Sequence, residues 1–251
     1  MAVIACALAT AVLAVHLMAR PGRPTPLTNP MDFRAFWCGS RTLLAGGDPY
    51  AVTALAQCER AAERADGVAR FVAHSTPAPL PPYALLAFAP LAMLPFPLAS
   101  AVWLLLSVAL VVASVVVWRR LTGFSPAVLA AVSIVPVVLI SVPLGQLGPL
   151  IVALVSGAAL ALRLGAPRAA AIAALGLAIE PHIGGPLLLA LALVERRARR
   201  TILLGVIALV ALSVATGGEL LREYVTNVLP HVARAELPFE WQFALSPMLW
   251  R

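Results

Sequence analysis

The sequence predicts an all-α protein, a polytopic transmembrane helical bundle with short juxtamembrane helices in its first outer loop. Hydrophobic residues make up 61% of the 251 residues, and the aromatic share is 6%, so the apolar excess is aliphatic. Charged residues make up 12%, against about 25% in a soluble globular chain. Because each span takes about 20 residues, little of the chain remains for a soluble domain. We therefore expect a single membrane domain.

The apolar runs are separated by polar or proline-containing connections, which divide the chain into segments. We interpret residues 2–19 as a first span, because they lack the basic n-region and the clear cleavage site of a signal peptide. An outer loop at 20–97, a helical bundle at 98–216 and an outer tail at 217–251 follow. The apolar runs inside the bundle are 98–118, 127–142, 150–162, 169–179, 183–194 and 202–216.

Arginine in the short connections predicts which ends of the spans face the cytoplasm. All 18 basic residues are arginine, and several gather at 119–120, 163–168 and 196–200. Under the positive-inside rule these three connections are cytoplasmic. Alternating crossings then place the outer loop, the turn at Gly145 and Gln146, and the tail on the periplasmic or extracellular face of the inner (plasma) membrane.

Residues 168–195 must leave the cytoplasmic side and return to it within a short stretch. About 25 residues cannot cross a ~30 Å hydrocarbon core twice at ~1.5 Å per residue. We therefore predict a shallow hairpin or broken helix with Glu180, Pro181 and His182 at its tip. Non-helical backbone at that depth is tolerated only against protein or in a water-filled cavity.

The outer loop contains the signals of two short helices. Asn29 is a suitable N-cap for the first, Pro30 suits the first helical position, and Gly46 or Gly47 suits the stop. The second runs from residue 52 to 64, with Asp48 and Pro49 at its start. We expect a structural role for Asp48.

Two further features of these helices concern the membrane surface and the redox environment. Helical spacing places Arg34, Trp37 and Arg41 on one face, a pattern typical of anchoring at lipid headgroups. Cys38 and Cys58 lie on the two helices in a compartment that we expect to be oxidising, so a disulfide between them is possible, and the sequence leaves their pairing open.

The composition also excludes several kinds of chemistry. Without lysine, the chain has no P-loop lysine and no Schiff-base lysine. The three cysteines lack the spacing of metal ligands, and no Asp-x-Asp occurs. We expect neither a metal nor a cofactor, and the arginines indicate orientation in the membrane rather than nucleic-acid binding.

Five motifs occur in an order that points to a family: Asp-Phe-Arg-Ala-Phe-Trp at 32–37, Leu-Leu-Ala-Gly-Gly-Asp-Pro-Tyr at 43–50, Pro-Pro-Tyr-Ala-Leu-Leu-Ala-Phe-Ala-Pro-Leu at 81–91, Gly-Gln-Leu-Gly at 145–148 and Pro-His at 181–182. Together they resemble glycosyltransferase family 87. Its members are membrane-embedded GT-C enzymes, similar to polyprenol-phosphate-mannose-dependent α-mannosyltransferases. The resemblance covers about residues 28–195, and the motifs before residue 51 are its most specific part.

The chain departs from that family at two points. Relatives commonly have Lys-Pro where this chain has Glu180 and Pro181, and relatives continue through further spans. A truncated member of the family is therefore one interpretation of the chain.

The resemblance implies an enzyme that moves a sugar, mannose in the relatives, from a polyprenyl-phosphate donor to a lipid or glycan hydroxyl on the outer face. Asp32 matches the general base, which would remove the proton of the acceptor hydroxyl. The departing lipid phosphate needs charge stabilisation, which arginine can provide. Candidate substrate-binding residues are Arg34, Arg41, Gln146, Glu180, His182, Arg222 and His231, with Arg234 as a further phosphate ligand.

Each candidate also has a structural interpretation. Asp32 could complete a helix cap, Gln146 could serve only a tight turn, and Glu180 and His182 could be solvated at the hairpin tip. Two other functions remain open for the whole chain. One is a transporter or flippase-like protein with Glu180 and His182 on the substrate path, although no inverted repeat is evident. The other is a truncated, non-catalytic membrane subunit.

Overall fold

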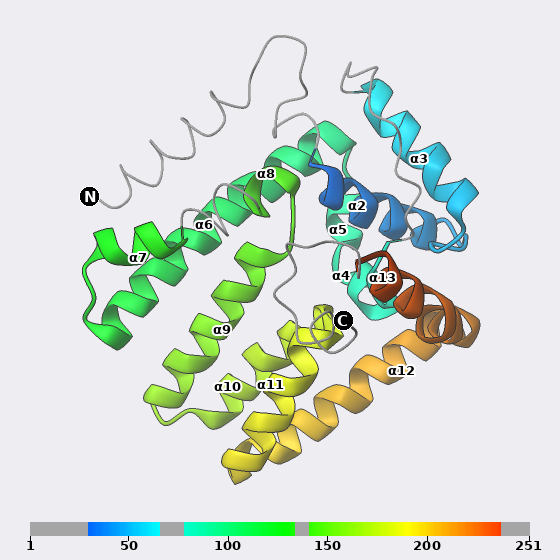
Figure 1. Ribbon diagram of the computed structural model, residues 1–251. Coiled ribbons are helices and arrows are strands. Elements are labelled where there is room, and N and C mark those ends of the chain that lie inside the picture. Colours follow the sequence, from blue (N-terminus) through cyan, green and yellow to red (C-terminus); the bar gives the residue numbers. More distant parts are fainter. Residues whose placement is uncertain (1–29, 66–77, 134–140, 237–251) are drawn as a thin grey trace.

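The computed structural model describes residues 30–65, 78–133 and 141–236 (Figure 1). The predicted first span at 2–19 and the end of the predicted tail lie outside these residues. Within the described residues every regular element is a helix, which confirms the all-α prediction.

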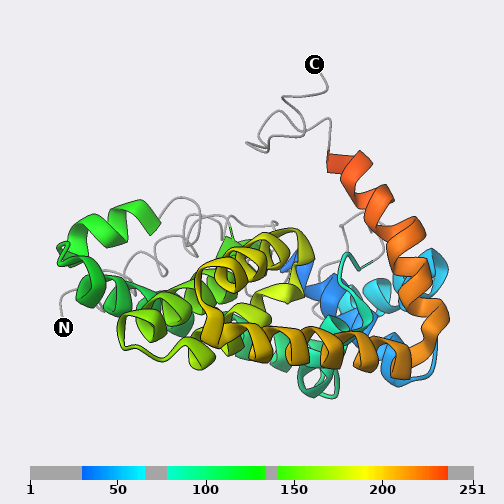
Figure 2. The ribbon, with the colours of Figure 1, turned by 90° about the horizontal axis from the view of Figure 1, so that it is seen from below.

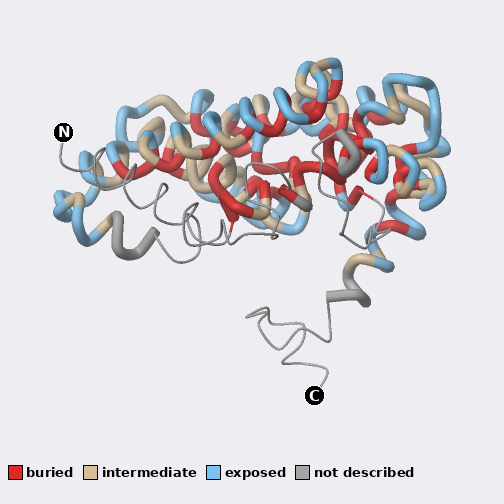
Figure 3. Tube along the Cα trace, turned by 90° about the horizontal axis from the view of Figure 1, so that it is seen from above, coloured by how far each residue is buried: buried red, intermediate tan, exposed pale blue. Residues whose placement is uncertain are grey.

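Five helices form the body of the molecule and pack as successive neighbours. Helix α6 contacts α9, α9 contacts α10, and α10 contacts both α11 and α12. In Figure 2 these helices form a flat layer. Figure 3 shows buried residues along the middle of this layer and exposed residues along its outer surfaces. Their bounds are Phe96–Thr122 for α6, Gly148–Arg163 for α9, Pro167–Gly176 for α10, Pro181–Val194 for α11 and Arg199–Glu223 for α12.

The long helices have the length and surface of membrane spans. By length and composition, the stretches Phe96–Thr122 and Arg196–Val232 could each cross a membrane. The 27 residues of α6 extend about 40 Å, beyond the ~30 Å hydrocarbon core. Large apolar side chains on the outside of the layer are exposed, including Leu105 at 70%, Leu193 at 68% and Leu203 at 61%. These features are compatible with a helical membrane bundle.

The arginine-rich connections lie at one end of this bundle. Arg163, at the end of α9, donates a hydrogen bond from Nη1 to the Leu121 carbonyl at the end of α6, at 3.3 Å. Ala198 follows α11 and packs in one buried cluster with Ala171 and Ala174 of α10. Arg199 donates from Nε to the Ala192 carbonyl at 2.7 Å, closing the end of α11. The arginine-rich connections thus share one end of the bundle, as the positive-inside rule requires of connections on the same side of the membrane.

The opposite end of the bundle contains the short helices of the first outer loop. Helix α2 (Met31–Leu44) packs against α3 (Val52–Ala65), α4 (Pro82–Ala87), α5 (Ala89–Ala92) and the start of α6. Helix α2 ends at Leu44, and Gly46, which follows the C-cap Ala45, has φ 73°, as the stop signal predicts. Before α3, Tyr50 N donates to Asp48 Oδ1 at 2.8 Å, which supports the structural role expected for Asp48.

The predicted spans 127–142 and 202–216 differ from the observed helices. Only α7 (Pro126–Ser133) and α8 (Val142–Leu144) are described in the first region. Helix α12 runs on beyond residue 216, with a kink at Gly217 where φ is 137°. A π-helical turn (Tyr224–Val228) and α13 (Leu229–Glu236) follow, and this part rises out of the layer in Figure 2. Glycine permits the kink because no Cβ opposes the positive φ.

Candidate active site

Asp32 lies in the first turn of α2, and the rest of that helix is held firmly by its neighbours. Phe33 is fully buried and stacks on Trp103 of α6, with ring centroids 5.4 Å apart. Trp37 Nε1 donates to the Leu91 carbonyl at 3.1 Å, and Ser40 Oγ donates to the Leu85 carbonyl at 2.8 Å. Aromatic packing and buried hydrogen bonds therefore fix the position of the helix that carries Asp32.

A disulfide joins α2 to α3. Cys38 and Cys58 are bonded, with their Cα atoms 5.8 Å apart, which answers the question of pairing that the sequence leaves open. Disulfides persist in oxidising compartments. The bond is therefore consistent with the predicted outer location of this loop.

Gln146 lies beside Asp32 although the two residues are far apart in the sequence. Its side chain hydrogen-bonds to the Asp32 carboxylate. The preceding residue makes this approach possible, because a Cβ on Gly145 would lie 2.6 Å from Pro30 Cβ and 2.7 Å from Phe33 Cβ. The structure thus brings together two of the predicted site residues, one from the outer loop and one from the Gly-Gln-Leu-Gly motif.

The surroundings of Asp32 raise the pKa of its carboxyl. Burial disfavours the charged form and raises the pKa, while the hydrogen bond from Gln146 lowers it, and burial is the larger effect. A carboxylate with a raised pKa is a stronger base than an exposed one. It can therefore accept a proton from a hydroxyl group more readily than an ordinary surface aspartate can.

The predicted hairpin is present, with Glu180 at its tip. Helix α10 and the short 3₁₀ helix Leu177–Ile179 lead to the tip, and the 14-residue α11 returns from it. Gly184 allows the close return, because a Cβ there would lie 2.5 Å from the backbone of Leu177. Ile179 belongs to the same apolar core as Phe33, so the tip lies at the α2 end of the bundle.

Glu180 and His182 are the ionisable groups of this tip. The Glu180 side chain is 23% exposed and that of His182 is 70% exposed, and Glu180 Oε2 lies 3.6 Å from His182 Nε2. This geometry fits partial solvation of the pair and leaves the His182 ring accessible to a ligand.

A cluster of tyrosines beside Glu180 is a feature that the sequence analysis missed. The rings of Tyr50 and Tyr224 lie 6.0 Å apart, and Tyr83 donates a hydrogen bond to the Ala178 carbonyl beside the tip. Tyr224 is close enough to Tyr83 and Glu180 to interact electrostatically with both. Burial raises the pKa of Tyr83 to about 12, so its hydroxyl stays protonated as a donor. Tyr50 and Tyr83 lie within two of the motifs that resemble the family, and this was the sequence signal that could have identified them as site residues.

The prediction that one face of α2 anchors it at lipid headgroups is wrong. Arg34 is 3% exposed and Trp37 is 6% exposed, because this side of α2 packs on protein instead of facing lipid. Arg41 is exposed, lies 5.1 Å from the centre of the Trp37 ring and donates to the Ala92 carbonyl at 3.4 Å. Arg34 and Arg41 thus contribute to the packing and the surface of α2.

The candidates beyond the kink point away from the core. Tyr224 and Val228 form the buried side of this segment, whereas Arg222 and His231 are exposed. Arg222 pairs with Glu219 on its own helix, with Nη2 2.6 Å from Oε2. Arg234 is exposed as well. The described contacts therefore do not include Arg222, His231 or Arg234 in the Asp32 site.

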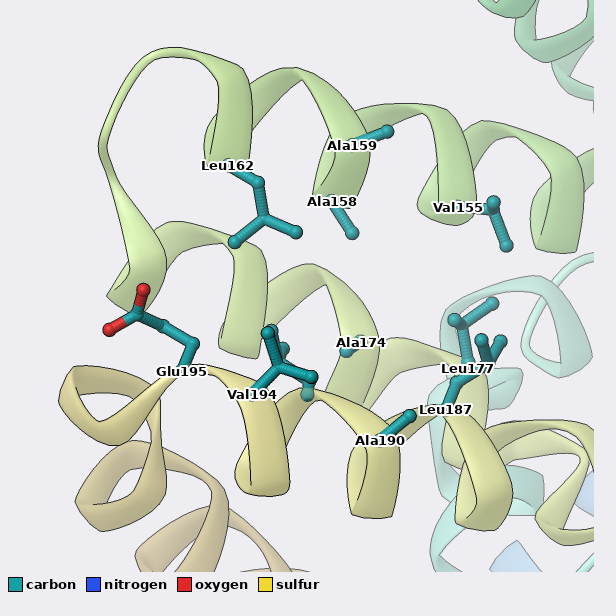
Figure 4. Close-up of a pocket in the computed structure, with 11 residues that line it drawn as sticks. Val155, Ala158, Ala159, Leu162, Ala174, Leu177, Leu187, Ala190, Val194 and Glu195 are labelled. Carbon is teal, nitrogen blue, oxygen red and sulfur yellow. The ribbon is translucent and has the colours of Figure 1, made fainter.

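An apolar cavity of about 360 Å³ lies between α9, α10 and α11 (Figure 4). Leu162 and Glu195 line its arginine-rich end, and Leu177 and Leu187 line the end near the hairpin tip. Glu195 is the one charged residue among those that line it. Among the described residues, no group of three or more His, Cys, Asp and Glu side chains could hold a metal ion.

One comparison with known proteins identifies a family. The family model described as Glycosyltransferase family 87 matches residues 80–251, which include Gln146 and Glu180 and begin after α2 and α3. No curated protein and no solved structure matches the chain. The match covers more than half of the chain and favours the enzyme over the transporter. The chain belongs to glycosyltransferase family 87 and is a membrane glycosyltransferase.

Proposed function

We propose that the protein transfers a sugar from a polyprenyl-phosphate donor to a lipid or glycan hydroxyl, with Asp32 as the general base. The sugar that we propose is mannose. The observation that carries this proposal is the Asp32 carboxylate itself. It is partly buried, hydrogen-bonded to Gln146 and of raised pKa, at the end of the bundle opposite the arginine-rich connections.

The reaction needs one proton acceptor and one stable leaving group. Asp32 takes the proton of the acceptor hydroxyl as its oxygen attacks the anomeric carbon, and the bond from that carbon to the phosphate oxygen breaks. The lipid phosphate keeps the electron pair and departs as an anion, so it needs no general acid. Attack from the side opposite the phosphate inverts the anomeric carbon. We assign the binding of this phosphate to His182, which is exposed at the hairpin tip and can donate a hydrogen bond to it.

The apolar cavity supports a lipid-linked donor. Its lining is hydrocarbon apart from Glu195. The end of the cavity at Leu177 is three positions before Glu180 at the hairpin tip. An apolar cavity of this kind favours a hydrocarbon chain over water. We therefore assign it to part of the polyprenyl chain, with the phosphate near the tip.

Two observations support a site on the outer face. The Cys38–Cys58 disulfide favours an oxidising compartment on the side of α2 and α3. The arginine-rich connections, which the positive-inside rule assigns to the cytoplasm, lie at the other end of the bundle.

The test is sugar transfer by the purified full chain in lipid nanodiscs, with labelled polyprenyl-phosphate mannose and a membrane lipid extract as acceptor. Asp32→Asn keeps the shape of the side chain and removes the base, so transfer should fall by about 10²–10⁴-fold. Asp48→Asn is the matched control, because its side chain is exposed and accepts a hydrogen bond in the turn before α3. Undiminished transfer by Asp32→Asn would reject the base, and no transfer from any polyprenyl-phosphate sugar would reject the donor class.

A further inference from the structure

The turn that carries Gln146 is locked to the start of α2. Gly145 packs so closely on Pro30 and Phe33 that a Cβ would lie within 2.7 Å of both. The Gly145 carbonyl accepts a hydrogen bond from Trp103 Nε1 at 3.0 Å. Since Phe33 stacks on the same indole at 5.4 Å, the turn and the first turn of α2 share one anchor on α6.

Gln146 is therefore held from both sides. Its backbone N–H donates to the Ser141 carbonyl at 2.8 Å, and its side chain hydrogen-bonds to Asp32. We propose that Gln146 is a positioning residue that orients the Asp32 carboxylate for proton transfer, and that it is not a ligand of the substrate. This inference rests on the proposed role of Asp32 as the base.

The amide does two things for a carboxylate base. A donor held on one oxygen restricts rotation of the side chain and leaves the other oxygen to take the proton, a form of preorganisation. The same donor stabilises the charged form, so the partly buried carboxyl stays ionised to lower pH than burial alone would allow.

Few other titratable groups lie on the elements that pack against α2. The described side chains of α5 and α8 include none, and α6 has only Arg119 and Arg120 near its far end. The remaining ones among the described side chains are Glu59 and Arg60 of α3, Tyr83 of α4, and Arg34 and Arg41 of α2 itself. Burial and Gln146 are the influences found on the pKa of Asp32.

The test compares pH profiles of transfer by wild type, Gln146→Met and Gln146→Glu in nanodiscs. Asp32 acts as a base only when it is deprotonated. Loss of the donor raises its pKa, so the acidic limb of kcat/KM should move to higher pH, by about one unit for Gln146→Met. Gln146→Glu places a second carboxylate beside the first and should move the limb further. In both variants we expect kcat to fall about tenfold or more, with little change in the KM for the sugar donor or in the KM for the acceptor. Asn227→Ala removes an exposed amide elsewhere and should leave the profile unchanged.

A second readout does not depend on activity. Infrared difference titration against Asp32→Asn reports protonation of the Asp32 carboxyl directly, and its pKa should rise in both Gln146 variants. A raised KM with unmoved pH limbs would overturn the proposal, because that pattern belongs to a substrate ligand. An unchanged carboxyl titration would overturn it as well. Transfer that survives Asp32→Asn would reject the base itself, whereas inactive Asp32→Asn with unmoved Gln146 profiles would reject only the positioning role.

Discussion

Removal of the Cys38–Cys58 disulfide should loosen α2 and α3 and thereby disturb the position of Asp32. The bond joins residues 20 positions apart. In the chain-entropy relation, closing a loop of that size stabilises the folded state by about 3 kcal/mol, or roughly a hundredfold in the opening equilibrium. Most other contacts of α2 remain in the variant, including the Phe33–Trp103 stack. We therefore expect local loosening of α2 and α3 and not loss of the bundle.

The assay is hydrogen exchange of the full chain in nanodiscs. The double variant Cys38→Ser, Cys58→Ser should exchange the amides of α2 and α3 up to roughly a hundredfold faster than wild type, with little change in α9. Reduction of wild type should have the same effect. Cys6→Ser is the matched control, since it removes a cysteine that is not part of this bond. Exchange of α2 and α3 that is the same in the double variant and in wild type would refute the reasoning.

Two more predictions concern the cavity and the hairpin. Ala190→Phe places a ring in the apolar cavity and should reduce transfer from long-chain polyprenyl donors more than from short-chain ones. A chain-length series measures this, and equal effects on all donors would contradict the assignment of the cavity. Gly184→Ala would bring a Cβ within 2.5 Å of the Leu177 backbone, so the purified protein should be destabilised by about 1–3 kcal/mol. Gly185→Ala is its control, because nothing lies within 4 Å of a Cβ there, and equal melting temperatures of the two variants would contradict the packing argument.

The helical architecture was largely predictable because it depends on local patterns. Apolar runs, proline and glycine signals and arginine clusters are properties of short stretches of sequence. They predicted α6, the helices of the first outer loop and the hairpin at Glu180. The length argument succeeded at the hairpin because the rise per residue limits what a short segment can span.

The burial of helix faces was not predictable in the same way. Arg34 and Trp37 look like an interfacial pair by spacing, yet both are buried against protein. An amphipathic pattern shows that one face avoids water or seeks it, but not whether lipid or protein covers that face. The sequence also predicted that the helix ends at residue 216. That prediction was wrong because the kink at Gly217 lets the helix change direction without ending.

The sequence by itself determined that this protein is an all-α membrane protein, which ends of its helices carry arginine, and which residues had the chemistry of a base. Only the tertiary structure decided that Gln146 contacts Asp32, that Cys38 pairs with Cys58, and that Tyr224 lies near Glu180. The physical reason is that composition and periodicity act over a few turns of helix. Contacts between distant segments depend on close packing, such as that of Gly145 on Phe33, which short-range patterns do not contain.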